Sequence, residues 1–326
     1  MLLRMRHFEM HPFIWGRLFS SSSLSLSSMD YHLSTIYMIS RLLYYLFLKP
    51  LSYLPMWFLH RISDLLFVVV YYLIAYRKEV VIENLTNSFP QKPPQEIREI
   101  SRKFYRHLCD IIMESVKLFS ISDAEALRRC TPSGTELLHR LYAEGRSAII
   151  IGGHYNNWEL AALRFKPLIA HRVIGIYSPL KNVFFNTKIQ QSRARFGMEL
   201  VPVKNTKQSF LALETERFVA IFGADQSPSR TSKNHYWTTF LNQDTAVFYG
   251  AEKYARKYNL PVIFVKIYKI KRSMYRYELT LIEENPADTP KGEITKKHVQ
   301  LLEQQIIEQP EYWLWTHKRW KIKRFL

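Results

Sequence analysis

Cysteine, glycine and acidic residues are all scarce in this chain of 326 residues. The two cysteines, Cys109 and Cys130, are too few for a disulfide framework or a cysteine-based zinc site, and they favour a reducing compartment. The ten glycines include no spacing of the Rossmann or P-loop type, which excludes these phosphate-binding loops. The 28 acidic residues are outnumbered by 46 lysines and arginines, giving a formal net charge of +18. Such a charge calls for an anionic partner: nucleic acid, an anionic membrane surface, or an acidic protein or ligand.

Apolar residues, in contrast, are abundant at 47%, and 14% of the chain is aromatic. This content excludes wholesale disorder, because a chain of this size buries a large core. The charge is unevenly distributed: residues 77–326 contain 40 basic and 25 acidic residues, whereas residues 1–76 are mostly apolar. The split predicts an N-terminal anchor followed by a cationic globular domain.

The N-terminal quarter divides into two segments. Residues 1–35 contain a serine-rich stretch at 20–28, which predicts a poorly ordered extension and makes Met29 an alternative translation start. Residues 36–76 contain three apolar runs, at 42–48, 51–59 and 65–76, none of which reaches the roughly 20 residues of a spanning helix. They fit either a buried helical hairpin or a membrane-embedded or interfacial anchor. Their many tyrosines and Trp57 favour the anchor, and Arg77 and Lys78 would then face the cytoplasm.

The remaining 250 residues predict an α/β domain, 77–326. Residues 77–145 are expected to be helical, with apolar positions at helical spacing along 95–120. Buried strands are expected at 147–151, 172–177, 198–203, 218–223, 261–268 and 275–282, and helices at 160–169, 183–196, 207–214 and 245–258. This alternation is typical of a largely parallel sheet flanked by helices.

The most informative stretch follows the first of these strands, at residues 149–159. Gly152 and Gly153 permit a tight turn, and His154 emerges at the carboxyl edge of the strand, where open α/β sheets bind ligands. Asn156 or Asn157 is suited to cap the following helix, which places Glu159 in its first turn, able to face the His154 ring. A carboxylate on one imidazole nitrogen leaves the other free to act as a base. A structural histidine in a turn is the plainer alternative.

The sequence of residues 152–159, Gly-Gly-His-Tyr-Asn-Asn-Trp-Glu, resembles the His-x4-Asp/Glu motif of the bacterial lipid A biosynthesis (lauroyl/myristoyl) acyltransferases, within the lysophospholipid and glycerophosphate acyltransferase superfamily. Further matches lie at 76–78, 84–85, 89–90, 193–197, 224–226, 240–250 and 310–321, so the resemblance covers roughly residues 36–324. The pattern is most similar to the Bacteroidetes branch. The resemblance implies a glycerophosphate-acyltransferase-like mixed, largely parallel sheet, preceded by a membrane-anchoring helical segment.

The resemblance also implies a reaction and a set of site residues. A fatty acyl chain passes from an acyl carrier protein thioester to a hydroxyl of a lipid A precursor, without a covalent enzyme intermediate. His154 is the implied general base and Glu159 its carboxylate partner, with Asp225 as a second carboxylate that contacts either His154 or the acceptor. A capping residue in a loop is the plainer alternative for Asp225. Arg193 and Arg195 resemble a phosphate-recognition block, and Asn157 and Gln226 are further candidates for substrate binding. No metal and no cofactor beyond the acyl donor is expected.

Basic and aromatic residues alternate along the C-terminal tail, 313–325. They suit an anionic membrane interface or lipid A phosphates, packing of the tryptophans on the domain, or, least of all, stacking with nucleic acid. The expected partners are therefore acyl carrier protein, a lipid A precursor and an anionic membrane surface, with no nucleic acid. The expected location is the inner (cytoplasmic) membrane, with the site facing the cytoplasm. Transfer to a phospholipid, aminolipid or other glycolipid is the alternative, followed by a noncatalytic membrane-binding protein.

Overall fold

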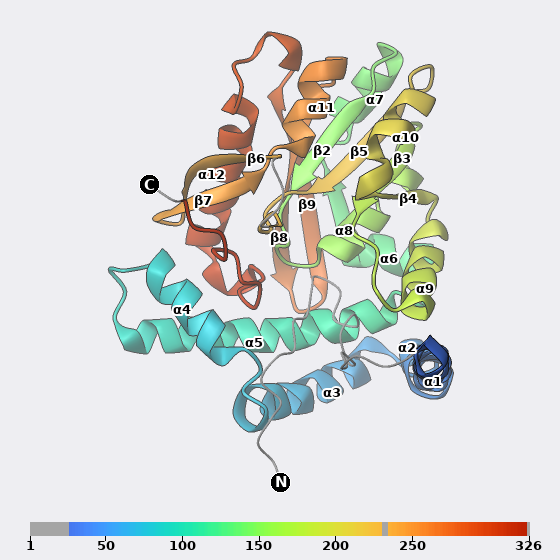
Figure 1. The fold of residues 1–326 in the computed structure, drawn as a ribbon, viewed down its shortest axis with the longest axis vertical. Coiled ribbons are helices and arrows are strands. Elements are labelled where there is room, and N and C mark those ends of the chain that lie inside the picture. The colour runs from blue at the N-terminus through green and yellow to red at the C-terminus, as the bar shows by residue number, and fades with distance from the viewer. Residues whose placement is uncertain (1–25, 230–233, 325–326) are drawn as a thin grey trace.

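A seven-stranded sheet between layers of helices forms the body of the protein, and an N-terminal group of helices lies across one end of it (Figure 1). The computed structural model describes residues 26–229 and 234–324. The strand order is β1-β9-β8-β2-β5-β3-β4, in which all neighbours are parallel except the antiparallel pair β8 and β9. The predicted α/β class, with a mixed and largely parallel sheet, is confirmed.

The strands of the sheet are β1 (Cys130–Ser133), β2 (Ala148–Gly152), β3 (Arg172–Tyr177), β4 (Met198–Pro202), β5 (Phe218–Gly223), β8 (Val262–Lys271) and β9 (Met274–Glu283). The helices of the body are α4 (Lys78–Ser88), α5 (Pro94–Lys117), α6 (Asp123–Arg129), α7 (Glu136–Ala143), α8 (Trp158–Leu163), α9 (Val183–Ala194), α10 (Thr206–Ala212), α11 (Gly250–Tyr258) and α12 (Glu293–Glu308). Short 3₁₀ turns lie at η3 (Lys166–Leu168), η4 (Val203–Asn205), η5 (Pro286–Asp288) and η6 (Pro310–Tyr312).

The central strand β2 is apolar throughout because both faces of the sheet are covered. Ile149 and Ile151 pack in one hydrophobic cluster with residues of α11 and α12, whereas Ile150 packs in a second cluster with α7 and α8. All three isoleucines are at most 1% exposed. The strand positions agree closely with those predicted for β2, β3, β4, β5, β8 and β9. The predicted helix 160–169 is helical only in its first part, because α8 ends at Leu163 and the 3₁₀ turn η3 follows.

One predicted helix, 245–258, is wrong in its first part. Residues Gln243–Phe248 form strand β7, which pairs antiparallel with β6 (His235–Phe240), and only the remainder is helix α11. The two strands are joined through Leu241 and Asn242, both with positive φ (50° and 62°). This is the backbone of a tight hairpin turn, for which Asn-Gly is the usual signature. The turn contains no glycine, so the sequence carried a weak signal. Strand β1 was also not predicted, since it lies within the stretch 77–145 that was expected to be helical.

The N-terminal segment comprises α1 (Leu26–Leu43), η1 (Tyr44–Leu48), α2 (Lys49–Tyr53), α3 (Met56–Val68) and η2 (Val69–Leu73), where η1 and η2 are π-helical turns. Residues 26–35, expected to be poorly ordered, are helical in α1, while the remainder of the predicted extension, 1–25, lies outside the described residues. The segment packs against α5 through buried side chains such as Leu59 and Phe67. The helical stretch Met56–Leu73 is, within the described residues, the one long and apolar enough to cross a membrane.

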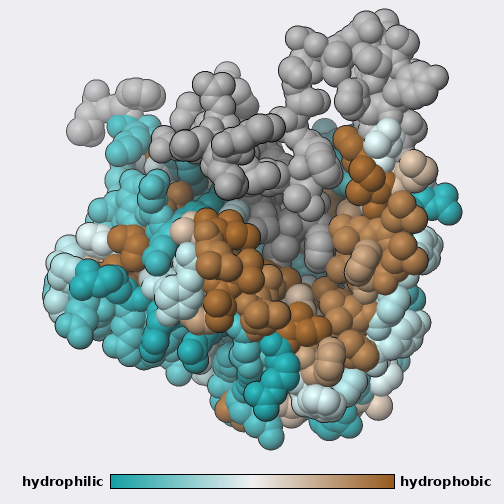
Figure 2. All heavy atoms as spheres, turned by 90° about the horizontal axis from the view of Figure 1, so that it is seen from below, coloured by the Kyte–Doolittle hydropathy of each residue, from teal (hydrophilic) through white to brown (hydrophobic). Residues whose placement is uncertain are grey.

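The other side of this segment is exposed and apolar. Of the twenty-one large hydrophobic side chains that are exposed among the described residues, fifteen lie between residues 37 and 74. Figure 2, which views the molecule from the side of α1 and α3, shows apolar side chains gathered in a band across this face. One side of the segment therefore belongs to the core, as in the hairpin interpretation, and the other offers the surface that an anchor requires.

Replacing Ile150 with alanine tests the role of β2 as the centre of the sheet. We expect Ile150→Ala to lower the free energy of unfolding by about 2–5 kcal/mol, because it leaves a cavity between two covered faces. The exposed Ile307 of α12 is the matched control, and Ile307→Ala is expected to change stability by less than about 0.5 kcal/mol. Denaturant unfolding in detergent measures both, and equal effects would contradict the two-sided burial of β2.

Candidate active site

The site begins where two neighbouring parallel strands end. Strands β2 and β5 pair in register up to Gly152 and Gly223, and the amide of Ala224 continues the pairing by donating to the Gly152 carbonyl at 3.1 Å. His154 and Asp225 each follow two residues beyond this last pair. Since side chains from the carboxyl ends of adjacent parallel strands meet at one edge, the register itself brings the imidazole and the carboxylate together.

The Asp225 carboxylate is buried and accepts three hydrogen bonds. The backbone N–H of His154 donates to Oδ2 at 2.9 Å, the ring Nδ1 of His154 to Oδ1 at 2.6 Å, and the indole Nε1 of Trp313 to Oδ2 at 2.8 Å. Burial raises the pKa of this carboxyl, but the electrostatic attraction of the His154 ring and these hydrogen bonds outweigh burial and hold the pKa well below its usual range. Asp225 is therefore an ionised, fixed acceptor.

The His154 ring is oriented on its other sides as well. Because Nδ1 donates to Asp225, Nε2 is the nitrogen whose lone pair remains available. The ring of Trp158 lies edge-on to it with centroids 5.0 Å apart, and the side-chain amide nitrogen of Gln226 lies 3.4 Å from Nε2. The His154 side chain is 14% exposed, so the pair is sheltered but reachable. An imidazole held in this way can accept a proton at Nε2.

Two glycines leave space around the His154–Asp225 pair. A Cβ on Gly223 would lie 3.1 Å from Cε1 of His154, and a Cβ on Gly153 would lie 2.8 Å from both methyl groups of Leu302. Glycine at these positions lets the backbone approach the imidazole and helix α12 closely.

Glu159 does not contact His154, which corrects the expected orientation of the histidine by this carboxylate. It lies in the first turn of α8, as predicted, but its carboxylate faces Arg193 of α9. Arg193 donates from Nε at 3.0 Å and from Nη2 at 2.5 Å, and the two side chains are only 9% and 13% exposed. The physical reason is that α8 begins at Trp158, so its first turn directs Glu159 toward the neighbouring helix, while Asp225 occupies the position next to the ring.

The other predicted substrate-binding residues have structural partners. Arg195, two residues beyond Arg193, donates from Nη2 to the carbonyls of Leu118 and Ile121 at 3.1 and 3.0 Å. Asn157 caps α8 by accepting from the amide of Leu160 at 2.8 Å. Gln226 is the candidate that lies directly beside Nε2 of His154. The structure thus brings together His154, Asp225 and Gln226, and pairs Glu159 with Arg193.

The C-terminal tail supplies a residue of the site that sequence reasoning missed. Trp313 and Trp315 are 1% and 0% exposed, so the tryptophans pack into the domain. The tail also pairs with the turn that carries His154, through a β-bridge between Tyr155 and Trp313. Packing of the tryptophans on the domain, one of the alternatives for this tail, is confirmed, but no signal in the sequence singled out the indole N–H of Trp313 as a hydrogen-bond donor to Asp225.

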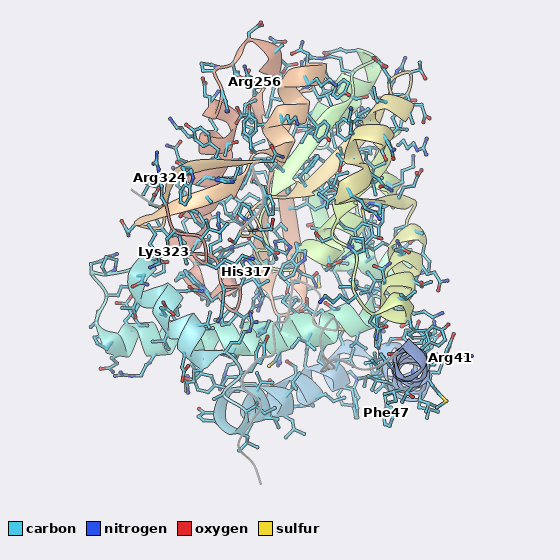
Figure 3. The ribbon with its side chains drawn as sticks, viewed as in Figure 1. Arg41, Phe47, Arg256, His317, Lys323 and Arg324 are labelled. Atoms are coloured by element: carbon cyan, nitrogen blue, oxygen red, sulfur yellow. The ribbon has the colours of Figure 1, made fainter. Side chains whose placement is uncertain are left out.

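A second tail residue, His317, fixes the segment after Asp225. Burial, followed by the nearby Arg319, lowers the pKa of His317 to about 3, so its ring is neutral. Its Nε2 accepts from the amide of Ser227 at 3.0 Å. Figure 3 places His317 toward the middle of the molecule, whereas the exposed Lys323 and Arg324 of the same tail lie at its edge.

Glu114 of α5 is another residue that sequence reasoning missed. It is 5% exposed and accepts from Asn157 at 2.6 Å and from the hydroxyls of Ser273 and Tyr275 at 2.7 and 2.9 Å. Burial raises the pKa of Glu114, against the opposing effect of the hydrogen bonds from Ser273 and Asn157. Through Asn157 this carboxyl holds the start of α8, and with it the turn that carries His154.

The chain is similar to known proteins along most of its length. Residues 28–322 match the model of the family described as bacterial lipid A biosynthesis acyltransferase. The chain is 22% identical over 249 residues to the lipid A biosynthesis palmitoleoyltransferase of Escherichia coli, and 24% identical over 252 residues to the lipid A biosynthesis lauroyltransferase of the same organism. These alignments cover 76% of this chain and 79% and 80% of the relatives.

The chain therefore belongs to the bacterial lipid A biosynthesis acyltransferases, enzymes that transfer acyl groups onto lipid A. Among residues 26–229 and 234–324, no group of three or more His, Cys, Asp and Glu side chains is arranged to hold a metal ion. The resemblance drawn from the motif at 152–159 is confirmed at the level of the family.

Substitutions at the His154–Asp225 pair test the assignment of the orienting carboxylate. We expect Asp225→Asn to reduce kcat by about 10²–10⁴-fold, because the amide no longer holds the proton on Nδ1. Trp313→Phe keeps an aromatic side chain but removes one donor to Asp225, and we expect a smaller loss of about tenfold. Steady-state acyl transfer by the folded variants measures both, and an unchanged kcat in Asp225→Asn would refute the pair.

The Glu159–Arg193 ion pair makes a separate prediction about stability. Glu159→Gln leaves a buried guanidinium without its carboxylate, so we expect a loss of about 3–5 kcal/mol in the free energy of unfolding. The matched control is Glu199→Gln, which removes an exposed ion pair with Arg172 and should cost no more than about 1 kcal/mol. Thermal or denaturant unfolding compares the two, and a negligible effect of Glu159→Gln would rule out a stabilising role.

Proposed function

We propose that this protein transfers a fatty acyl chain from the thioester of acyl carrier protein to a hydroxyl of a lipid A precursor, with His154 as the general base. The observation that carries the proposal is the geometry of His154: Asp225 holds Nδ1, and Nε2 is left as the acceptor of a proton at the edge of the sheet. Membership of the family supports the transfer of an acyl group and lipid A as the class of acceptor.

The reaction needs no nucleophile from the protein. Nε2 of His154 takes the proton of the acceptor hydroxyl as its oxygen attacks the thioester carbonyl carbon. The resulting tetrahedral oxyanion collapses, the carbon–sulfur bond breaks, and the imidazolium returns the proton to the leaving thiolate. Asp225 stabilises the imidazolium between these two steps, because its ionised carboxylate stays hydrogen-bonded to Nδ1. The products are an ester and a free thiol.

Three further residues support this chemistry by positioning. Gln226 lies 3.4 Å from Nε2, where its amide also meets the incoming hydroxyl. Glu159 and Arg193 join α8 to α9 through a bidentate ion pair and so fix the wall beside the histidine. These roles replace the phosphate recognition expected of Arg193, whose guanidinium is already bonded to a carboxylate.

Charge and hydropathy support the proposed partners and location. Residues 77–326 contain 40 basic and 25 acidic residues, which suits an acidic carrier protein and an anionic leaflet. The exposed apolar band of α1, α3 and their π-helical turns suits insertion into the inner membrane (Figure 2). With this face in the lipid, the domain that follows from Lys78 onward lies on the cytoplasmic side, where acyl carrier protein is found.

Mass spectrometry of lipid A from a deletion strain tests the acceptor. We expect lipid A that lacks one acyl chain, and its restoration by the wild-type gene but not by His154→Ala. Protein levels and membrane fractionation of the His154→Ala strain control for folding, since this side chain is not part of the core.

Two results would contradict the proposal. Unchanged lipid A together with an altered phospholipid, aminolipid or glycolipid profile would assign a different acceptor. Restoration by His154→Ala would refute the general-base mechanism, whatever the acceptor.

A further inference from the structure

A polar cleft of about 380 Å³ opens between the N-terminal helices and the β8–β9 turn. It is lined by residues of α3, α5, the turn and η6: Asp64, Arg106, Asp110, Lys269, Ile270, Lys271, Arg272 and Tyr312. The turn packs on α3, since Nε2 of His60 lies 2.6 Å from the hydroxyl of Ser273. On the inner side of the cleft, the backbone carbonyl of Tyr312 accepts from the amide of Asn156 at 3.0 Å, so Tyr312 contacts both the cleft and the turn that carries His154.

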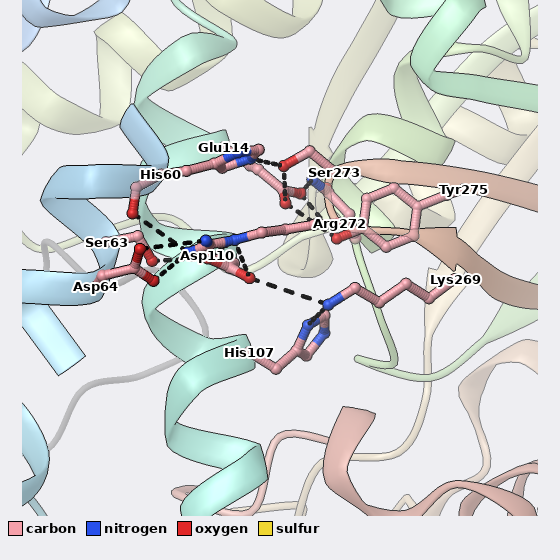
Figure 4. A network of polar contacts seen from close by, with 11 residues as sticks. His60, Ser63, Asp64, His107, Asp110, Glu114, Lys269, Arg272, Ser273 and Tyr275 are labelled. Atoms are coloured by element: carbon pink, nitrogen blue, oxygen red, sulfur yellow. Dashed lines mark hydrogen bonds and ion pairs between the residues drawn. The ribbon is translucent and has the colours of Figure 1, made fainter. Parts of the chain in front are cut away.

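Four cations and two carboxylates line the cleft, and one of the cations satisfies both carboxylates. Arg272 donates to Asp110 at 2.6 and 2.9 Å and to Asp64 at 2.7 Å (Figure 4). Asp110 is held further by the hydroxyl of Ser63 at 2.7 Å. The remaining positive charge of the cleft comes from Arg106, Lys269 and Lys271.

Lys269 is the innermost of these three cations. Its side chain is 13% exposed, and its amino group donates to Nδ1 of His107 at 3.2 Å and lies 4.0 Å from Asp110. Burial lowers the pKa of Lys269, against the attraction of Asp110 and Glu114. An anion bound in the cleft would favour the charged amine of Lys269, because its negative charge would compensate for the water that burial removes.

The two outer cations have no carboxylate partner among the described residues. The guanidinium of Arg106 lies 5.0 Å from the ring centre of Phe67 on the N-terminal segment, and Lys271 is exposed on the turn. Forked and mobile donors of this kind, converging on one cleft, suit a phosphate. By contrast, Arg193 and Arg195 are engaged with Glu159 and with backbone carbonyls.

The surroundings of the cleft indicate where the phosphate comes from. Ile270, near the end of β8, is 61% exposed, and the neighbouring α3 exposes Leu65 (66%) and Val68 (44%). Exposed apolar side chains beside unpaired cations are typical of a surface that meets the headgroup layer of a membrane. We propose that this cleft binds the phosphate of an anionic lipid, at a site separate from His154. The proposal rests on the membrane location given under the proposed function.

Binding of a short-chain lipid to the full-length protein in neutral detergent tests the site. Isothermal titration with dihexanoyl phosphatidylglycerol is compared between wild type and the double variant Arg106→Gln/Lys271→Gln. We expect binding roughly thirtyfold weaker in this variant, because two cations are lost from the headgroup site. The matched control is Lys207→Gln/Lys253→Gln, which removes two exposed lysines of α10 and α11, and it should bind like wild type.

Competition then identifies the source of the phosphate. Displacement of the phosphatidylglycerol by a purified lipid A precursor assigns the cleft to the acceptor, and failure to displace assigns it to a bilayer lipid; either result supports a lipid phosphate site. Inorganic phosphate competing as strongly as the lipid would overturn it, as would equal binding by the two double variants. We expect His154→Ala to bind the lipid like wild type. Lipid binding in the cleft is therefore tested independently of acyl transfer, and one proposal can fail without the other.

Discussion

The hydrogen bonds accepted by the Asp225 carboxylate are the constraint on which the site depends. They come from the backbone and ring of His154 and from the indole of Trp313, which belong to segments far apart in the sequence. Each requires a different part of the fold: the register of β2 and β5 supplies the first two, and the packing of the tail supplies the third. A buried carboxylate is costly unless its oxygens are satisfied, so the sheet and the tail both contribute to holding Asp225 in its ionised form.

A second polar chain links this site to the N-terminal segment. Asn157 at the start of α8 bonds to Glu114 of α5, Glu114 bonds to Ser273 in the β8–β9 turn, and Ser273 lies against His60 of α3. Every member of this chain is within hydrogen-bond distance of the next, with separations of 2.6–2.7 Å. Helix α8, which follows the turn that carries His154, is therefore linked by hydrogen bonds to α5, the β8–β9 turn and α3, and not to the sheet alone. The exposed apolar face lies on the same N-terminal segment as α3.

Sequence reasoning located the strand ends well, because short apolar runs ended by glycine are a strong local signal. It therefore placed His154 and Asp225 correctly, each just beyond a strand. It could not show that β2 and β5 are neighbours, since strand order is not a local property, and so it chose the nearer carboxylate, Glu159, as the partner of the ring. The role of Trp313 was out of reach for the same reason: its contact with Asp225 spans 88 positions of the sequence. The family resemblance gave the reaction class, but not this geometry.

The contribution of the tail also has a consequence for synthesis. A chain is made from its N-terminus, so the apolar segment and the histidine emerge long before Trp313 does. Until then Asp225 lacks one of its three donors, and the turn around Tyr155 lacks the strand-like partner that Trp313 provides. In a growing chain the apolar segment is thus complete while the His154–Asp225 pair still lacks part of its support. The last part of the domain to be made supplies the final hydrogen bond to Asp225.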